Sequence, residues 1–131
     1  MRRKVAQFCN VAPEAVIQSI DASTIYKVPT MMHEQHLDDL VLKFTGTESK
    51  GEPNHSAWNE FLRKLDSAEK VVTIGLVGKY VELQDAYKSI NESLMQAATY
   101  CDHKLNLVYI HSEKLDDKNV DEKLSGMDGV V

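Results

Sequence analysis

The feature that most constrains the fold is an apolar run rich in β-branched residues, Val71–Val77. A nearly continuous run of this kind is typical of a strand buried on both faces of a parallel sheet. Apolar residues at helical spacing follow over Asp85–Tyr100, and a second apolar run follows at Leu105–Ile110. Because strands alternate with a helix, this part of the chain predicts an α/β fold with right-handed crossovers.

The end of the chain continues the alternation. Asp116–Leu124 predicts a charged helix, and Gly126–Val131 predicts a third strand that begins without being finished. Ligands of open α/β sheets gather beyond the carboxyl ends of the strands. We therefore expect the chain to be an internal piece of a larger enzyme. So few strands leave open edges, and we expect the isolated chain to aggregate or to form oligomers.

The first part of the chain predicts shorter elements. Lys4–Val11 and Val16–Ile20 have the apolar pattern of short extended segments, the first a strand. Val28 precedes a proline, which favours an extended backbone at that position. Thr30 is then a suitable cap for a helix that runs through Met31, Met32 and Gln35.

A second helix and a linker follow. Leu37–Phe44 has apolar residues on one face and predicts a helix. Residues 45–54 contain no large apolar side chain except that of Pro53, and they predict a loop. Ser56–Leu65 predicts a short amphipathic helix, so we expect the domain boundary between residues 45 and 69.

Composition excludes several classes of protein. The net charge of −5 argues against binding of duplex nucleic acid, which favours a basic surface. No apolar run approaches the roughly 20 residues that a membrane span requires. The basic, then apolar start lacks a signal-peptide cleavage pattern, so we expect a cytoplasmic protein. The two cysteines, Cys9 and Cys101, fit a reducing compartment, and we expect buried free thiols.

Few residues carry an obvious chemistry. Gly75–Lys79 follows a strand but lacks the spacing of a phosphate loop, and Tyr80 occupies the place of the Mg²⁺-binding hydroxyl. Lys79 nevertheless lies at the carboxyl end of that strand. Lys4, at the head of a predicted strand, is either an exposed flank residue or a phosphate contact, and composition favours the flank.

The histidines and paired acids predict solvated surfaces. His33 and His36 lack a third ligand with zinc spacing, so no metal site is expected. Asp38 and Asp39 are sequence neighbours, as are Asp116 and Asp117, and neighbours on a helix point about 100° apart. They are therefore expected to be solvated rather than to form an acid–base pair.

Three runs resemble the CTP synthase family, whose members hydrolyse glutamine and aminate UTP with ATP. Lys4–Val11, together with Val16-Ile17 and Ile25–Pro29, is similar to the end of the family's synthetase (amidoligase) domain. Thr73–Leu83, continuing through Ser89, resembles the opening of its class I glutaminase domain. Leu124–Val131 resembles the strand that leads into that domain's glycine-rich oxyanion loop.

The resemblance implies a domain organisation. Residues 1–44 would be the C-terminal piece of the synthetase α/β domain, and residues 45–69 would be an interdomain linker with a short helix. Residues 70–131 would be the first strands and helices of the doubly wound parallel sheet of a class I glutamine amidotransferase. Both domains would be incomplete.

The resemblance also implies the chemistry of a parent enzyme. Family members release ammonia from glutamine with a Cys–His–Glu triad, phosphorylate UTP with ATP and Mg²⁺, and convert it to CTP. GTP activates glutamine hydrolysis, CTP inhibits as product, and the family forms tetramers. None of the catalytic groups lies in this chain, so it is expected to make no CTP and hydrolyse no glutamine in isolation. The competing hypothesis is a natural short, non-catalytic protein that interacts with the full-length synthase.

Binding residues carry over position by position. Lys4 matches the family lysine that contacts UTP or CTP, and a cation is a suitable triphosphate partner. Ile20, Asp21 and Ala22 match the segment that holds the adenine of ATP, with Ala22 commonly Val in the family. His36 stands where a helix-terminating glycine is common. The residues that match the interdomain region linked to ammonia passage and GTP activation are Lys79, Tyr80 and Lys88. No metal ligand is implied in this chain.

Overall fold

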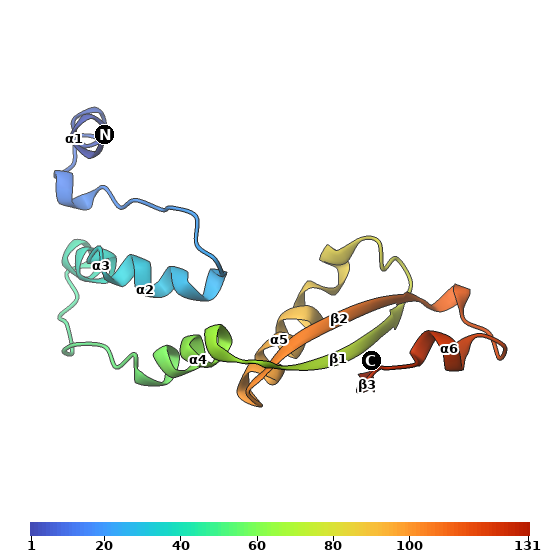
Figure 1. Ribbon diagram of the computed structural model, residues 1–131. Helices are drawn as coiled ribbons and strands as arrows, with labels where there is room; N and C mark the ends of the chain where they lie inside the picture. The colour runs from blue at the N-terminus through green and yellow to red at the C-terminus, as the bar shows by residue number, and fades with distance from the viewer. The chain divides into compact units, whose positions relative to one another are not determined.

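The computed structural model describes residues 1–131 apart from the side chain of Gln84, and the chain forms two compact units. The first unit spans residues 1–55 and contains only helices and irregular segments (Figure 1). The second unit spans residues 56–131 and contains the sheet. The helix α4 (Ser56–Ser67), which lies inside the predicted linker, belongs to the second unit.

The second unit is a three-stranded parallel sheet in the order β2-β1-β3. The strands are β1 (Lys70–Gly78), β2 (His103–His111) and β3 (Gly129–Val130). β1 and β2 pair along their full lengths, from Lys70 opposite His103 to Gly78 opposite His111. The predicted parallel α/β fold is therefore confirmed for this part of the chain.

Helices connect the strands. A 3₁₀ turn, Gln84–Tyr87, passes into α5 (Lys88–Tyr100), and a second 3₁₀ turn, Ser112–Lys114, precedes α6 (Val120–Leu124). The predicted Asp85–Tyr100 and Asp116–Leu124 helices thus exist, although their regular parts begin later. The predicted helix Ser56–Leu65 is confirmed as α4.

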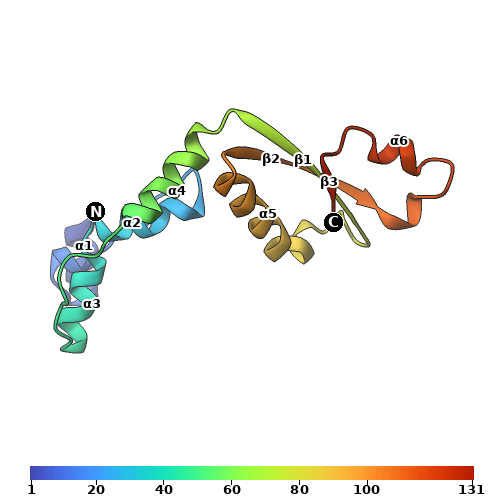
Figure 2. The ribbon, with the colours of Figure 1, turned by 90° about the horizontal axis from the view of Figure 1, so that it is seen from below.

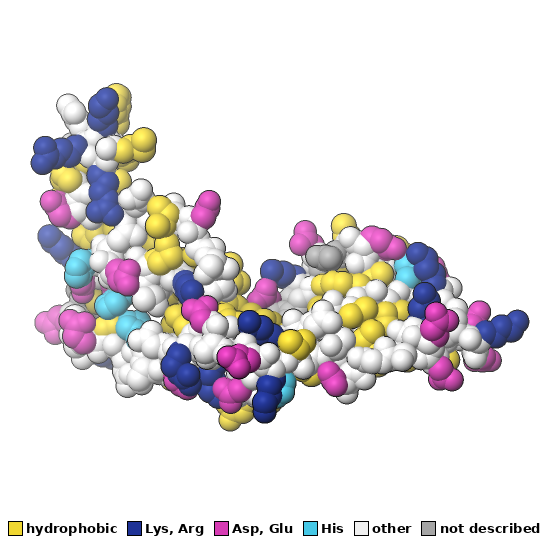
Figure 3. Space-filling model, in the orientation of Figure 1, with side chains coloured by type: hydrophobic (Ala, Val, Ile, Leu, Met, Phe, Trp, Pro, Cys, Tyr) yellow, Lys and Arg dark blue, Asp and Glu magenta, His cyan; other side chains and the backbone are white. Residues whose placement is uncertain are grey.

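α5 covers one face of the sheet (Figure 2). Its apolar residues Leu94, Ala97 and Ala98 line a groove with side chains of β1 and β2. The core is densest where the carboxyl half of β1 meets this layer, because Leu76 is almost fully buried. The opposite face is only partly covered, and Val71 is 57% exposed. Figure 3 shows hydrophobic side chains gathered over the sheet on the face towards the viewer. The expectation of a strand buried on both faces therefore holds only for the carboxyl half of β1.

Lys64 of α4 contacts the C-terminal end of α5. Lys64 Nζ donates to the carbonyl oxygen of Tyr100 at 3.2 Å and lies 3.0 Å from Oδ1 of Asp102. These contacts place a cation at the C-terminus of α5, where exposed carbonyl groups and the helix dipole favour positive charge.

The first unit consists of α1 (Arg2–Cys9), α2 (Val28–His33) and α3 (Leu37–Thr45), with 3₁₀ turns at Pro13–Ala15 and Ile25–Lys27. The prediction of a strand at Lys4–Val11 is wrong, because this segment forms α1. A strand needs a hydrogen-bonding partner, and the described residues 1–55 contain no strand that could provide one. Asn10 ends the helix in the left-handed conformation, with φ of 52°.

The region around Pro29 also differs from the prediction. Val28 is helical, with φ of −59° and ψ of −44°, although it precedes Pro29, which lies in the first turn of α2. A proline there removes no intrahelical hydrogen bond, since first-turn amides have no helical acceptor. The N-cap residue of α2 is Lys27, whose side chain makes no capping hydrogen bond, and the predicted cap Thr30 lies inside the helix. Thr24 caps the preceding 3₁₀ turn instead, where its hydroxyl accepts from the amide of Tyr26 at 3.4 Å. α2 ends at His33, before the predicted end at Gln35.

Other expectations for the first unit have mixed outcomes. α3 confirms the predicted helix Leu37–Phe44. Val16–Ile20 lies in an irregular segment that belongs to no strand. The expectation of buried thiols is wrong, because Cys9 and Cys101 are both exposed at the ends of helices.

Among the residues that the structure describes, no helix combines the length and apolar character needed to cross a bilayer.

The packing of Gly78 yields a stability prediction. A Cβ atom at this position would overlap the Tyr87 hydroxyl and lie 2.9 Å from Tyr87 Cζ. We expect Gly78→Ala to lower the free energy of unfolding by about 1–3 kcal/mol, the usual effect of overpacking. Gly75→Ala is the matched control in the same strand, because its Cβ would meet Ile110 at an ordinary 3.4 Å. Urea denaturation of both variants tests this, and equal stabilities would contradict it.

Candidate functional site

The carboxyl edge of the sheet gathers the residues singled out in the second unit. Gly78 and His111 are paired at the ends of β1 and β2, so the loops after both strands leave from the same edge. Lys79 follows β1, and its ammonium lies 3.2 Å from the carboxylate of Glu113, which follows β2. Both side chains are more than 60% exposed, so the ion pair adds little stability and leaves the ammonium accessible.

Tyr87 fixes the loop after β1 to the start of α5. Its hydroxyl donates a hydrogen bond to the backbone carbonyl of Lys79, in the space that Gly78 leaves open. Because Tyr87 directly precedes α5, this bond brings Lys88 to the same edge as Lys79. The ammonium of Lys88 lies 2.8 Å from the carboxylate of Glu92, one helical turn further on.

Tyr80 has an uncommon backbone conformation at this edge. Its φ is 58°, in the left-handed region that residues with a Cβ seldom adopt. Its carbonyl accepts from the amide of Leu83 at 2.9 Å, which closes a tight turn. The residue is 73% exposed, so the turn presents an aromatic side chain to solvent directly after Lys79 in the chain.

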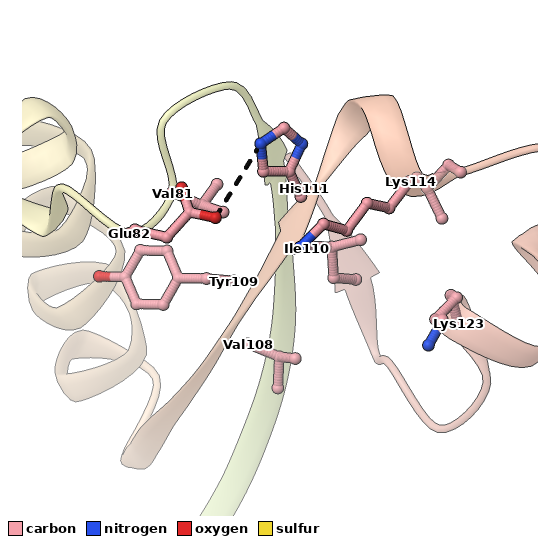
Figure 4. A pocket seen from close by; sticks show the side chains of 9 residues that line it. Val81, Glu82, Val108, Tyr109, Ile110, His111, Lys114 and Lys123 are labelled. Carbon is pink, nitrogen blue, oxygen red and sulfur yellow. Dashed lines mark ion pairs between the residues drawn. The ribbon is translucent and has the colours of Figure 1, made fainter.

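A pocket of about 480 Å³ lies beside this edge, lined from the loop after β1, from the end of β2 and from α6 (Figure 4). Glu82 faces His111, with 4.0 Å between Oε1 and Nε2, and the Lys114 side chain lies alongside Ile110. His111 Nδ1 accepts from the amide of Glu113 at 3.3 Å, which leaves Nε2 to carry the proton towards Glu82. The pocket can therefore offer an imidazole, a carboxylate and lysine ammonium groups to a polar ligand.

Sequence reasoning missed Glu82 and His111 as site residues. The usable signal was position, because both lie just beyond or at the carboxyl ends of paired strands, where ligands of parallel sheets bind. The pairing register that sets them side by side could not be derived from the sequence, since the two strands lie 24 residues apart in the chain.

The first unit carries the nucleotide-binding candidates. Lys4 lies on α1, not at the head of a strand, and it is exposed together with Arg2 and Arg3. Ile20 and Asp21 are exposed, and Ala22 is half-buried, in the irregular segment between the two 3₁₀ turns. A pocket of about 350 Å³ in this unit is lined by residues including Arg2, Glu14 and Gln35. Lys4 and residues 20–22 are not among its lining residues.

The turn between α2 and α3 is held by two histidine–aspartate pairs. His36 is the N-cap of α3 and has a φ of 60°, in the left-handed region that glycine adopts without strain. This conformation explains why the resembling family commonly has glycine at this position. His36 Nδ1 lies 3.1 Å from Asp39 Oδ2, and both side chains are largely exposed. His33 Nδ1 lies 2.6 Å from Asp38 Oδ2, so the expectation that His33 and Asp38 are merely solvated is wrong.

The His33–Asp38 contact shifts the pKa values of both side chains. The hydrogen bond to Asp38 raises the pKa of His33 above its ordinary value of 6.5, against a smaller opposing effect of burial. The same bond lowers the pKa of Asp38 below its ordinary value of 3.8. The His33 ring also packs against the His55 ring, with 4.7 Å between centroids. In the described part of the chain, no group of three or more His, Cys, Asp or Glu residues could hold a metal ion.

The fold and the edge residues define an α/β protein with exposed cations at the carboxyl ends of parallel strands. Comparison with known proteins narrows this class. Residues 1–46 match the family model described as CTP synthase N-terminus. The chain is 56% identical over 129 residues to the CTP synthase of Porphyromonas gingivalis (strain ATCC 33277), covering 98% of this chain and 24% of that protein.

Two further relatives cover the whole chain. The CTP synthase of Bacteroides fragilis (strain ATCC 25285) is 56% identical over 131 residues, which are 25% of its length. That of Flavobacterium johnsoniae is 52% identical over 131 residues, which are 24% of its length. The resemblance to the CTP synthase family is thus confirmed, and the chain is homologous to CTP synthases along its whole length. It spans about a quarter of the length of these curated relatives.

The His33–Asp38 pair predicts a pH dependence of stability. The raised pKa of His33 means that its contribution is present below pH 6.5 and is lost as pH rises through the raised value. The lowered pKa of Asp38 means that its contribution is present above pH 3.8 and is lost as pH falls through the lowered value. We expect the first unit to be more stable at about pH 5.5 than at about pH 8 because of this pair.

The Asp38→Asn variant should lose this difference. The Asp39→Asn variant is the control, because Asp39 pairs with a histidine through side chains that are both largely exposed and should matter little. Chemical denaturation at the two pH values, followed by signals of the first unit, measures the effect. The interpretation fails if Asp38→Asn keeps the pH difference of the unsubstituted chain.

Proposed function

We propose that this chain is part of a glutamine-hydrolysing CTP synthase, a ligase of pyrimidine nucleotide biosynthesis. The observation that carries the proposal is the identity of 50–56% to CTP synthases over essentially every residue of the chain. Residues 1–44 then form the end of the synthetase domain, residues 45–69 the linker, and residues 70–131 the opening of the glutaminase domain. We further propose that the parent enzyme is cytoplasmic and forms homotetramers.

The proposed reaction has three balanced steps. Glutamine is hydrolysed to glutamate and ammonia. The γ-phosphoryl group of ATP is transferred to O4 of UTP, which turns a poor leaving oxygen into a good one. Ammonia attacks C4, and phosphate leaves to give CTP. A closed passage for ammonia keeps it away from water and unprotonated.

This chain's residues take binding roles in that scheme. Lys4 is assigned to the UTP or CTP nucleotide, which its exposed position on α1 supports, since an accessible ammonium group suits a triphosphate. Residues Ile20–Ala22 are assigned to the adenine of ATP, whose base edge an exposed irregular backbone can hydrogen-bond. Mg²⁺ would accompany ATP, but the described residues offer no cluster of ligands for it, and we assign it none here.

The edge of the second unit is assigned to activation by GTP. Lys79 and Lys88 carry exposed ammonium groups, and Tyr80, which follows Lys79 in the chain, presents an exposed aromatic ring. Cations suit a triphosphate, and an aromatic ring suits stacking on a purine. The tie from Tyr87 to Lys79 holds these side chains in one region.

The direct test is an assay of the purified product of the complete gene. Incubated with UTP, ATP, Mg²⁺ and glutamine, it should form CTP, ADP, phosphate and glutamate in equal amounts. Ammonium chloride should replace glutamine as the nitrogen donor. A product that consumes no UTP under either condition would overturn the proposal.

Removing the ammonium group of Lys4 should selectively weaken the binding of UTP. In the complete enzyme, we expect Lys4→Ala to raise KM for UTP about tenfold or more, the effect of losing one charge-assisted hydrogen bond. Arg3→Ala, which removes a neighbouring cation about 100° around the same helix, is the control. Initial rates at varied UTP and saturating ATP measure both, and equal effects of the two substitutions would argue against a specific role for Lys4.

Substitution at the sheet edge should separate the two nitrogen donors. We expect Lys79→Ala to reduce the activation of glutamine-dependent synthesis by GTP about tenfold while leaving ammonia-dependent synthesis unchanged. Lys104→Ala, an exposed lysine near the opposite end of β2, is the control. CTP formation with each donor at varied GTP measures the outcome. Unaltered GTP activation in Lys79→Ala would remove this residue from the assignment.

A further inference from the structure

Gln35 links three segments of the first unit through a single carboxamide group. Its Oε1 accepts from Arg2 Nη2 at 2.6 Å and from the backbone amide of Gln18 at 2.8 Å. Its Nε2 donates to the backbone carbonyl of Gln18 at 2.8 Å and to that of Met31 at 3.1 Å. The carboxamide thereby joins α1, the irregular segment around Gln18, and α2.

The contact with Gln18 has the pattern of a strand pair. Both the amide and the carbonyl of Gln18 bind the same side-chain group, as two hydrogen-bonded residues of neighbouring strands do with each other. Residues 16–20 belong to no strand, so Gln35 supplies the backbone partner that a sheet would otherwise provide. The position of this segment therefore depends on one side chain.

The orientation of the carboxamide is determined by its surroundings. Two donors meet Oε1 and two carbonyl oxygens meet Nε2, so rotating the amide by half a turn would set donors against donors and acceptors against acceptors. The bond to Met31 lies within α2 and its following turn, so that helix anchors the carboxamide. Arg2, at the start of α1, completes the arrangement.

We propose that Gln35 is a positioning residue that holds the segment Ile20–Ala22 in the conformation that accepts the adenine of ATP. The inference rests on the proposed function, in which that segment binds ATP. Gln18 lies two residues before Ile20, and backbone groups can bind a base edge only when their direction is fixed. Ordering a loop at the moment of binding weakens affinity, so a segment that is already fixed binds ATP more tightly.

The test is steady-state kinetics of the complete enzyme carrying Gln35→Ala. We expect KM for ATP to rise about three- to tenfold, the effect of losing one or two neutral hydrogen bonds, with KM for UTP and kcat unchanged. Gln18→Ala is the matched control, because Gln35 contacts only the backbone of Gln18 and this variant keeps both hydrogen bonds. A selective rise in KM for ATP in Gln35→Ala alone supports the proposal. Unchanged KM for ATP, or an equal rise for both substrates, overturns it.

A second variant keeps the test valid if Gln35→Ala fails to fold. Gln35→Glu has the same shape and keeps the acceptor for Arg2 and the Gln18 amide, but it sets a carboxylate oxygen against the carbonyls of Gln18 and Met31. We expect it to raise KM for ATP as Gln35→Ala does. The Gln18 amide should also exchange its hydrogen about three- to tenfold faster in Gln35→Ala without ATP present. An unchanged hydrogen-exchange rate at the Gln18 amide would overturn the proposal that Gln35 fixes this segment.

Asp21→Ala separates this proposal from the proposed function. If Asp21→Ala raises KM for ATP and Gln35→Ala does not, the assignment of the ATP segment stands and the role of Gln35 is overturned. If the complete enzyme makes CTP and Asp21→Ala leaves KM for ATP unchanged, the ATP assignment itself fails. If faster exchange at Gln18 accompanies a selective rise in KM for ATP, both are supported.

Discussion

The parallel pairing of β1 with β2 is the interaction on which the second unit depends. Parallel strands cannot be joined by a tight turn, so the chain must return through a crossover, and α5 fills that role. The crossover supplies the layer that buries Leu76, the most buried apolar residue of β1. The same register sets the ends of both strands at one edge, where Gly78 faces His111 and the loops with Lys79 and Glu113 meet.

The first unit is organised by a different kind of interaction. Its described residues include no strand, and side chains bind the backbone or each other where regular pairing is missing. Gln35 pairs with the backbone of Gln18, and His33 pairs with Asp38 across the turn between α2 and α3. Each of these contacts is made by a side chain and not by the backbone hydrogen bonds within a helix, so we expect the positions of segments and the stability of helices to be separable here.

The parts of the fold that could be predicted from sequence are those decided by local pattern. Val71–Val77 and Leu105–Ile110 are β-branched or apolar runs bounded by polar residues, and both are strands. Lys4–Val11 has an equally apolar pattern but forms α1, because a strand is stable only with a partner and the pattern contains no information about one. Val28 was predicted from the steric effect of Pro29, yet the preceding 3₁₀ turn leads directly into α2, and tertiary context prevails over the local preference.

The candidate site follows the same division. Lys79, Tyr80 and Lys88 were found by resemblance, and the general rule for parallel sheets explains why they lie at the carboxyl edge. The proximity of Glu82 and His111 could not be predicted, since it depends on the pairing register of β1 and β2. The contacts of Gln35 and Asp38 were missed because no sequence pattern predicts them. Gln35 binds the backbone of a residue 17 positions away, and Asp38 binds the His33 ring across a turn.

The two units should therefore respond differently to substitution at positions that touch no ligand. The sheet edge is positioned by nine paired residues of β1 and β2, and a one-residue slip would turn every side chain to the wrong face. A single substitution cannot shift so long a register, so the strand ends at this edge keep their positions. The segment Ile20–Ala22 has no such redundancy, because the carboxamide of one residue holds the backbone beside it. We therefore expect ligand binding to be more sensitive to remote point substitutions in the first unit. There the backbone is positioned by one hydrogen-bonding group, whereas in the second unit it is positioned by a whole strand.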